Sequence, residues 1–383
     1  MKVSLSSGFN RVLAAMLHAL TSLFFLALLT VTSSLHAEQQ CVDTPEPLNV
    51  WFFLPGDSHN LFWRSSRQFA EAVADDLRVN ARMVVIEEYS DNRLGFEELI
   101  KQTMDIPDRE LPDAVISILY GGGEFSQISL LHKYSVPFLT FNTSLDENVL
   151  KLTGLPRTMF PRWIEHISPD EQLAGGQLVD AIAQRTSGKT MAILAGPTRS
   201  TVNSHRVKGA QAKAGELGLE VIPPVYTDWT RQSSERAANV LLQRIPDIDM
   251  LWTAGPDIAQ GAIDVLRQQN SSIVVGSFDW SKSNIELIKQ QHLTVSFGGH
   301  FMEAGWALIM AYDYLRGANF IHDTDSVLFS ELKKLDSENV SQIERLIINE
   351  NWRSIDFSAF SKCLSGNHEN YDFSLQKHIT SAR

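Results

Sequence analysis

The feature that most constrains the fold is a regular alternation of short apolar runs with segments of helical periodicity. Runs of strand length occur at Leu48–Leu54, Ala81–Ile86, Ala114–Leu119, Val136–Phe141, Met191–Ala195, Glu220–Ile222, Met250–Thr253, Ile273–Phe278 and Leu293–Phe297. Helical patterns lie between them at Arg64–Leu77, Arg93–Met104, Ser126–Tyr134, Pro169–Arg185, Ser204–Leu217, Ser233–Arg244, Ile258–Gln268 and Phe301–Arg316. Strands that alternate with helices predict parallel sheets with right-handed crossovers. We therefore expect an α/β fold.

The alternation occurs as two series, which predicts two lobes. The first series ends near Asn142 and the second begins near Met191. Between them, residues 145–166 are irregular and include Pro156 and Pro161, so we interpret this segment as a crossover between the lobes. The late elements, from Leu293 to Asn319, are expected to return to the first lobe.

The N-terminus has the three-part pattern of a cleavable export signal. Lys2 and Arg11 supply positive charge, and an almost wholly apolar stretch follows over residues 20–31. Small and polar residues then lead to Ala37, so we expect residues 1–37 to be removed near Ala37. The alternative is an uncleaved membrane anchor, which needs about 20 apolar residues, and this stretch is shorter.

The charge balance argues against whole classes of partner. The sequence has 33 basic and 45 acidic residues, a net charge of −12, and loss of Lys2 and Arg11 makes this −14. A strongly acidic protein is a poor partner for nucleic acid and for anionic membrane surfaces.

The chain has two cysteines, Cys41 and Cys363, near opposite ends of the exported part. In an oxidising compartment they can form a disulfide that ties the C-terminal region to the first strand. The alternative is two unrelated thiols. Neither their number nor their spacing indicates a metal site, and we expect no cofactor.

Candidate binding residues follow the strands, because ligands of open α/β sheets bind beyond the carboxyl ends of the strands. The loop after the first run contains Ser58 and Asn60 and ends at Phe62 and Trp63. Hydroxyl and amide groups suit a hydroxylated ligand, and flat aromatic faces suit the C–H face of a sugar ring. The alternative for the two aromatic residues is packing into the core.

Later strand exits repeat this mixture of aromatic and polar residues. Asn142 and Thr143 follow the fourth run, and Arg206 follows the fifth. Arg206 can direct two hydrogen bonds at adjacent oxygens of a ligand, or it can pair with an acid of the protein. The other candidates are Trp229, Asp257, Phe278, Asp279, Trp280 and His300. Together they predict an aromatic-lined polar cleft between the lobes.

Catalytic motifs are missing from the sequence. Residues 121–123 are three glycines without the Lys-Ser/Thr of a phosphate loop. No GxSxG, HExxH or CxxC pattern occurs, and His166, His205 and His300 stand in unrelated contexts. We predict a binding protein and not an enzyme.

At these residues the sequence resembles the type 1 periplasmic binding proteins of the ribose and galactose group. The resemblance extends from about Leu48 to Phe360, and it is carried by residues 55–63, 136–142, 196–209, 246–262, 275–279 and 298–305. Within the group, the sequence looks most similar to the LuxP-type receptors of autoinducer-2. That likeness rests on the spacing in 55–63, on Asn142-Thr143, Arg206 and Pro256-Asp257, and on residues 352–357.

The resemblance implies two Rossmann-like lobes with parallel sheets, joined by a three-strand hinge, which close over a sugar-like ligand. Residues 48–165 and 300–326 would form the N-terminal lobe, residues 166–299 and 327–360 the C-terminal lobe, and residues 366–383 a polar tail. Ser58, Asn60, Trp63, Asn142, Arg206, Asp257 and the turn at 278–280 would face the cleft.

It also implies a function in the periplasm. The expected role is capture of a sugar or sugar-like molecule and its presentation, by a monomer, to an inner-membrane ABC permease. The alternative is a ligand-sensing subunit of a LuxP-type receptor that acts on a membrane sensor kinase. Two departures from the LuxP pattern favour a sugar over autoinducer-2: no arginine stands at 299–300, and Ser58 replaces a glutamine. A repressor of related fold is excluded, because the export signal stands where its DNA-binding headpiece would be.

Overall fold

The computed structural model describes residues 41–42, 46–56, 61–86, 93–120, 122–318, 327–349, 352–366 and 370–375. The predicted export signal, the candidates Ser58 and Asn60 and most of the predicted polar tail lie outside these residues. From Val42 onward the chain forms one compact unit. Among the helices of the described residues, none combines the length and hydrophobicity that a membrane crossing requires.

The first sheet has six strands in the order β12-β5-β4-β3-β1-β2, and all their pairings are parallel. Their bounds are β1 (Asn49–Pro55), β2 (Asn80–Ile86), β3 (Ala114–Ile118), β4 (Phe138–Phe141), β5 (Trp163–Pro169) and β12 (Val327–Ser330). The helices of this lobe are α2 (Leu61–Leu77), α3 (Arg93–Met104), α4 (Glu124–Lys133), α5 (Glu147–Thr153) and α11 (Glu303–Leu315). The centre of the sheet is buried on both faces, which explains why β1 and β3 are apolar except for Asn49 and Ser117.

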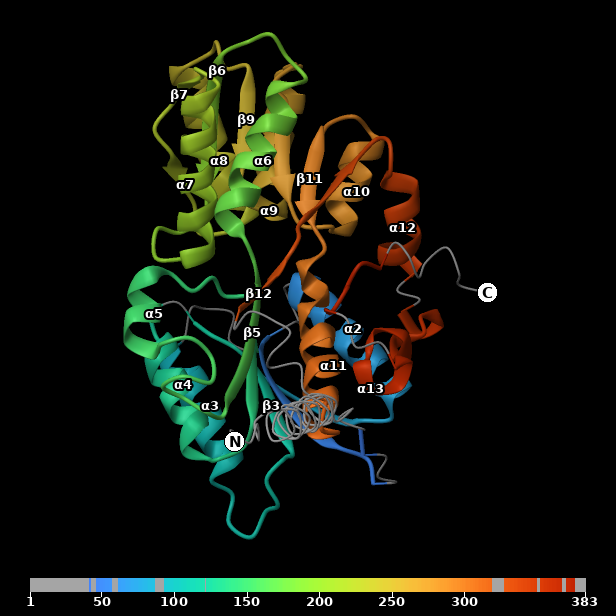
Figure 1. Ribbon diagram of the computed structural model, residues 1–383. Coiled ribbons are helices and arrows are strands. Elements are labelled where there is room, and N and C mark those ends of the chain that lie inside the picture. Colours follow the sequence, from blue (N-terminus) through green and yellow to red (C-terminus); the bar gives the residue numbers. More distant parts are fainter. Residues whose placement is uncertain are drawn as a thin grey trace, which may run out of the picture. The chain divides into compact units, whose positions relative to one another are not determined.

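Helices α2 and α11 pack against each other over one face of the first sheet (Figure 1). Gly305 makes this close approach possible, because a Cβ there would lie 2.6 Å from ring atoms of Phe69. The Phe69 ring lies 5.0 Å from that of Trp306 and 5.4 Å from that of Trp352, measured between centroids. The short 3-10 helices η2 (Trp352–Ser354) and η3 (Phe357–Phe360) complete this aromatic core, and α13 (Lys362–Ser365) follows.

The second sheet has the order β13-β11-β10-β9-β6-β7, with β8 paired to β6. Its strands are β6 (Thr190–Ala195), β7 (Glu220–Val221), β8 (Val225–Tyr226), β9 (Met250–Thr253), β10 (Val274–Phe278), β11 (Val295–Gly298) and β13 (Lys333–Asp336). Its helices are α6 (Glu171–Ala183), α7 (Thr201–Glu216), α8 (Arg231–Arg244), α9 (Pro256–Gln268), α10 (Lys282–Lys289) and α12 (Val340–Asn349). Among the described strands of this sheet, only β13 runs antiparallel, against β11. The predicted α/β fold with two mostly parallel sheets is confirmed.

Three passages of the chain between the sheets lie within the described residues. The first passage joins β5 to α6 near Asp170, and the second joins β11 to α11 through the 3-10 helix η1 (His300–Met302). The third joins β12 to β13 between Ser330 and Lys333. Figure 1 shows β5 and β12 side by side where the chain leaves the first sheet, in agreement with the pairing of Val327 with His166.

The predicted lobe boundaries need correction at three places. Residues 327–330 form β12 of the first sheet, and residues 352–360 pack on α2, so neither belongs to the second lobe. The second sheet receives only β13 from this region, together with α12, which packs on α10 and β13. All of β5, beyond residue 165, lies in the first sheet. Residues 327–330 stay in the first sheet because β12 pairs with β5 before the chain passes to the second sheet.

The segment predicted to be irregular, 145–166, contains α5 and most of β5. The strand β5 was not predicted, because Glu165 and His166 interrupt its apolar sequence although the strand is buried. Arg157 compensates for the buried polar groups: its Nη1 donates to the carbonyl of Ile164 and lies 3.4 Å from the Glu165 carboxylate. The ring Nδ1 of His166 is 2.8 Å from the Thr140 hydroxyl.

Candidate functional site: a cleft at the strand exits

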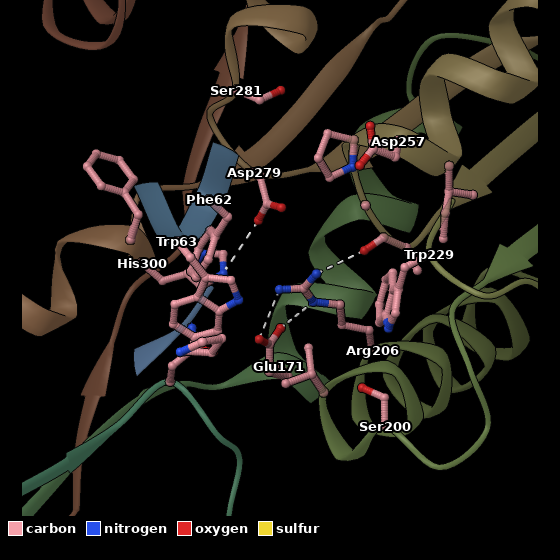
Figure 2. Close-up of a pocket in the computed structure, with 18 of the residues that line it drawn as sticks. Phe62, Trp63, Glu171, Ser200, Arg206, Trp229, Asp257, Asp279, Ser281 and His300 are labelled. Atoms are coloured by element: carbon pink, nitrogen blue, oxygen red, sulfur yellow. Dashed lines mark hydrogen bonds and ion pairs between the residues drawn. The ribbon is translucent and has the colours of Figure 1, made fainter. Parts of the chain in front are cut away.

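A cavity of about 730 Å³ lies where the carboxyl ends of both sets of strands meet. Ten of the predicted binding residues line it: Phe62, Trp63, Asn142, Thr143, Arg206, Trp229, Asp257, Asp279, Trp280 and His300. Phe62, Trp63 and His300 lie on one side of the view in Figure 2, with Arg206, Trp229 and Asp257 on the other. Residues more than 200 positions apart are thus brought together, as expected from the strand-exit rule.

The first lobe supplies flat apolar walls. Phe62 and Trp63 occupy the first turn of α2, directly after the exit of β1, and their rings meet edge to face with centroids 4.9 Å apart. The Phe62 ring also lies 4.7 Å from the His300 ring, and Trp63 lies 6.4 Å from Phe141. Both side chains are partly buried against the core and still line the cavity. The predicted alternatives, cleft wall and core packing, are therefore combined in the same residues.

Three cavity residues have the left-handed backbone conformation that side chains other than glycine rarely adopt. The φ angles are 69° at Asn142, 68° at Trp229 and 70° at Asp279. Asn142 and Asp279 each follow directly after the last residue of a strand, so the chain turns sharply there and directs the next side chain into the cavity. Such strain concentrates at functional sites when the surrounding fold maintains it.

Arg206 is paired with a buried acid, Glu171. Its Nε lies 2.5 Å and its Nη2 2.9 Å from the two carboxylate oxygens of Glu171, while Nη1 donates to the carbonyl of Ala254 at 2.9 Å (Figure 2). The guanidinium also stacks on the Phe278 ring at 4.1 Å. Burial raises the pKa of Glu171, and the charge of Arg206 opposes that rise. Of the two predicted roles for Arg206, the structure shows the ion pair.

Two glycines bring this ion pair together. Glu171 begins α6, and Arg206 lies in the second turn of α7. A Cβ at Gly175 would lie 2.0 Å from the carbonyl oxygen of Arg206, and a Cβ at Gly209 would lie 1.8 Å from that of Gln172. Because both positions are glycine, the two helix backbones touch and Glu171 comes within hydrogen-bond distance of Arg206.

Asp279 and His300 lie next to each other in the lining of the cavity. Nε2 of His300 lies 3.4 Å from an Asp279 carboxylate oxygen (Figure 2). Burial lowers the pKa of His300 well below its usual value, so the ring is neutral at physiological pH. Burial also raises the pKa of Asp279 to about 6, against the opposing charge of Arg206. Asp279 therefore changes charge within a mildly acidic pH range.

Phe278 is not a cavity residue, and its prediction as a ligand contact is wrong. It is fully buried, and its ring packs on Trp252 and beneath Arg206. Successive residues of a strand face opposite directions, so Phe278 and Asp279 cannot both point into the cleft.

The remaining predicted residues sit on the second lobe. The Trp229 indole rests against the exit of β6, because Gly196 leaves space where a Cβ would lie 2.4 Å from the ring. Asp257 is in the first turn of α9, and burial raises its pKa. Trp280 donates from Nε1 to the carbonyl of Lys333 at 3.0 Å. Across the cleft, the Thr143 hydroxyl donates to the carbonyl of Leu119.

This architecture matches known proteins. Residues 135–319 match the family model of the periplasmic binding protein domain. The ribose import binding protein RbsB of Bacillus subtilis (strain 168) is 23% identical over 202 residues, which are 51% of this chain and 61% of that protein. The chain therefore matches less than two thirds of the length of this curated relative. A periplasmic sugar-binding protein from Pseudomonas fluorescens superposes with a TM-score of 0.74 at 22% identity, over 86% of this chain and 98% of that one.

The chain has the fold of the type 1 periplasmic binding proteins. A second solved structure, an ABC transporter solute-binding protein from Actinobacillus succinogenes 130z with bound D-allose, superposes with a TM-score of 0.68 at 17% identity. That match covers 78% of this chain and 100% of the other.

Sequence reasoning missed several residues that line the cavity. Glu171 is the most important, since an acid in the first helical turn is usually explained by the helix dipole alone. Tyr120, Arg199, Ser281 and Lys282 also line the cavity. Each of these four lies at the exit of a strand or the start of a helix, so the strand-exit rule would have found them if applied to every loop. Among the described residues, no group of three His, Cys, Asp or Glu side chains is arranged to hold a metal ion.

Proposed function

We propose that this protein is exported to the periplasm, captures an uncharged sugar or sugar-like molecule in the cleft and presents it to an ABC importer of the inner membrane. The combination of aromatic walls and hydrogen-bonding groups around one cavity carries this proposal. The relatives support it by name, since they include a ribose import protein and an ABC transporter protein with bound D-allose.

The side chains of the cavity suit a sugar ring. Phe62, Trp63 and Trp229 present flat apolar faces for the C–H groups of the ring. Asn142, Asp257 and Asp279 present amide and carboxylate groups for its hydroxyls. A pocket of predominantly apolar wall with a few convergent polar groups is typical of small-molecule sites.

The charges favour a neutral ligand. Arg206 already balances Glu171, so the buried part of the cavity has no unmatched positive charge from this pair to attract a phosphate, carboxylate or borate ester. His300, where the LuxP pattern would place an arginine, is neutral because burial lowers its pKa. We therefore favour transport of a sugar over the alternative of a LuxP-type autoinducer-2 receptor that signals through a sensor kinase.

Capture would use the three passages between the sheets as a hinge. A ligand that contacts Trp63 on one side and Asp279 on the other stabilises the arrangement in which both contacts form, and the equilibrium moves toward that arrangement. The importer would then recognise the closed protein.

A thermal-shift screen tests the proposal. D-Ribose, D-allose and D-fucose are compared with ribose 5-phosphate and autoinducer-2. A neutral sugar at one hundred times its Kd should stabilise the protein by about 2.7 kcal/mol, whereas ribose 5-phosphate and the borate ester of autoinducer-2 should have little effect. The variant Trp229→Ala should lose the shift. Tyr226→Ala is the matched control, since Tyr226 is an exposed aromatic residue at the end of β8, three positions before Trp229, and does not line the cavity. A response to autoinducer-2 alone would reject the sugar proposal in favour of the signalling alternative.

We also propose that Cys41 and Cys363 form a disulfide. Both lie within the described residues, and neither is a free thiol. Peptide mapping of the purified protein without reductant should recover one cross-linked peptide, and intact mass measurement should show loss of the first 37 residues. Size-exclusion chromatography with light scattering tests the expected monomer.

A further inference from the structure

A second cavity, of about 280 Å³, lies beside the cleft and has no part in the proposed capture of sugar. Among the described residues, it shares only Trp280, Gly299 and His300 with the lining of the cleft. Its volume is close to the lower limit for small-molecule sites. Its apolar wall is made of Ile167, Met302, Trp306, Leu328, Phe329, Ile343, Phe373 and Leu375.

The C-terminal segment closes one side of this second cavity. The Phe373 ring stacks on the Trp306 ring at 4.9 Å between centroids, and the Tyr371 ring stacks on Phe373 at 5.1 Å. The Tyr371 hydroxyl donates to the buried carboxylate of Asp313 at 2.8 Å, which ties the segment to α11. Leu375 is also buried. Specific contacts therefore hold this wall in place.

Two buried side chains of the lining each have a polar atom without a hydrogen-bond partner among the described residues. These atoms are Oε2 of Glu303 and Nδ1 of His300, and the two residues are 0% and 6% exposed. They stand three positions apart where η1 meets α11, and side chains at this spacing in a 3-10 turn lie on the same side. Burial of an unpaired polar atom is costly, so the two atoms indicate a group that binds both.

The two unpaired atoms are one donor and one acceptor. Burial raises the pKa of Glu303 well above its usual value, which favours the protonated carboxyl group. Its Oε1 accepts from the Ser330 hydroxyl, so the proton belongs on Oε2. Burial keeps the His300 ring neutral by lowering its pKa, and the Asp279 carboxylate, 3.4 Å from Nε2, favours the proton on Nε2. Nδ1 is then an acceptor. A hydroxyl group accepts one hydrogen bond and donates another, so it matches both atoms.

The other polar groups of the lining are paired or in contact with solvent. The Asn339 amide donates to the carbonyl of Lys334 at 2.7 Å and accepts from the backbone N–H of Asp336 at 3.0 Å. Lys333 pairs with Glu331, and Lys334 pairs with Asp336. The remaining polar residues are at least partly exposed and are Gln342, Asp372 and Ser374. A sugar needs partners for several hydroxyl groups, whereas the described lining offers buried partners for one.

We propose that the second cavity is a separate binding site for a small neutral alcohol or phenol. The apolar body of this molecule packs on the wall that contains Trp306 and Leu328, and its hydroxyl bridges Glu303 and His300. The site goes beyond the proposed capture of sugar and does not depend on it. Because His300 also lines the cleft, a molecule bound here holds one wall of the sugar site in place.

The probe that tests this site is para-fluorophenol, and fluorine NMR measures its binding to the mature protein. A molecule of this size should bind with a Kd of about 1 mM. Fluorobenzene has the same ring without the hydroxyl, so it leaves Glu303 and His300 unpaired and should bind about tenfold more weakly. Glu303→Met removes the donor while filling a similar volume, and this variant should bind the two probes about equally.

A second variant tests the location of the probe. Leu328→Trp fills the cavity from β12 without removing either polar group, and it should abolish binding of both probes. Leu94→Trp is the matched control, since Leu94 is exposed on α3 and lines neither cavity. Trp229→Ala, which alters the cleft, should leave the Kd of para-fluorophenol unchanged. Melting temperatures check that each variant folds, and the Glu303→Met comparison decides if Leu328→Trp does not.

Four results would overturn the proposal. Equal binding of the two probes to wild type, or a tenfold preference that persists in Glu303→Met, would show that these groups do not recognise the hydroxyl. Loss of binding in Trp229→Ala but not in Leu328→Trp would place the probe in the cleft. Absence of para-fluorophenol binding would show that water alone satisfies the two groups. A sugar screen without a hit changes none of these results, so the capture proposal and this site fail separately.

Discussion

The two sides of the cleft are built from different chemistry. The first lobe contributes the aromatic faces of Phe62 and Trp63, whereas the second lobe contributes, besides the Trp229 ring, the ion pair of Glu171 and Arg206 with Asp257 and Asp279 nearby. The aromatic wall stands on a helix that the core of the first sheet already fixes. The charged wall instead depends on the opposite charges of Glu171 and Arg206, which neutralise each other while both side chains are buried. We therefore expect changes in the first wall to affect binding and changes in the second to affect folding as well.

The largest expected effect comes from removing the cation of the second wall. Arg206→Ala leaves Glu171 buried without a partner, which should lower the free energy of unfolding by about 3–5 kcal/mol. Urea denaturation at pH 7 measures this loss, and the loss should shrink at low pH as Glu171 takes up a proton.

The matched control replaces both partners by apolar residues of similar size. Glu171→Leu with Arg206→Met should recover most of the lost stability, because a well-packed apolar pair replaces a buried ion pair at little cost. A single Arg206→Ala variant that loses less than about 1 kcal/mol would contradict the contrast between the two walls.

The next effect should appear in binding and not in folding. Trp63→Ala removes a partly buried ring from the first wall, and the sugar found in the screen should bind about tenfold to a hundredfold more weakly, a loss of about 1.4–2.8 kcal/mol. Calorimetry gives the Kd, and urea denaturation should show a smaller change than in Arg206→Ala. Phe125→Ala is the control, since Phe125 is an exposed ring on α4 that does not line the cleft.

The difference between apolar residues and buried polar residues also explains how much of this protein could be predicted from its sequence. The alternation of apolar runs predicted the α/β fold, and nearly every strand with an apolar sequence was found. The strand β5 was missed because Glu165 and His166 are buried in it, and the help they receive from Arg157 and Thr140 comes from other parts of the fold. Sequence alone does not show that a buried polar residue has a distant partner.

The prediction of the cleft residues was limited in a similar way. Residues that follow strands, such as Trp63 and Asn142, were found because chain position determines where they lie. Glu171 was missed because its role requires the close approach of two helices at Gly175 and Gly209, a contact between surfaces that the sequence does not display. Phe278 was assigned wrongly because a difference of one residue in a strand reverses the direction of the side chain.

A smaller effect, in pH dependence, tests the charged wall at Asp279. Its pKa is raised to about 6, so in the folded protein it becomes ionised only as the pH rises toward neutrality. Ligand hydroxyls favour the ionised carboxylate, and we expect the affinity for sugar to rise severalfold, by up to about tenfold per pH unit, between pH 5 and 7. Calorimetry across this range measures the trend, and Asp279→Asn should bind with little pH dependence in the same interval.

The stability of the sugar-free protein should change with pH in the opposite direction. A carboxyl group with a raised pKa favours the folded state when protonated, so its contribution to the free energy of unfolding falls as the pH rises from about 4 to 6. Asp279→Asn should remove this fall. Identical pH profiles for wild type and variant, in binding and in stability, would show that Asp279 does not titrate in the cleft.

The smallest effect is expected at Asp228, which lines the cleft but is exposed. Its carboxylate accepts hydrogen bonds from the Thr230 hydroxyl at 2.6 Å and the Thr230 backbone N–H at 3.1 Å, and these lower its pKa. A lowered pKa stabilises the fold above the usual pKa and is lost as the pH falls through the folded-state value. Because water screens this exposed group, Asp228→Asn should change the free energy of unfolding at pH 7 by less than about 0.5 kcal/mol. A loss of stability as large as that of Arg206→Ala would contradict this comparison. It would mean that replacing any charged residue of the second lobe destabilises the protein, whether or not the charge is buried.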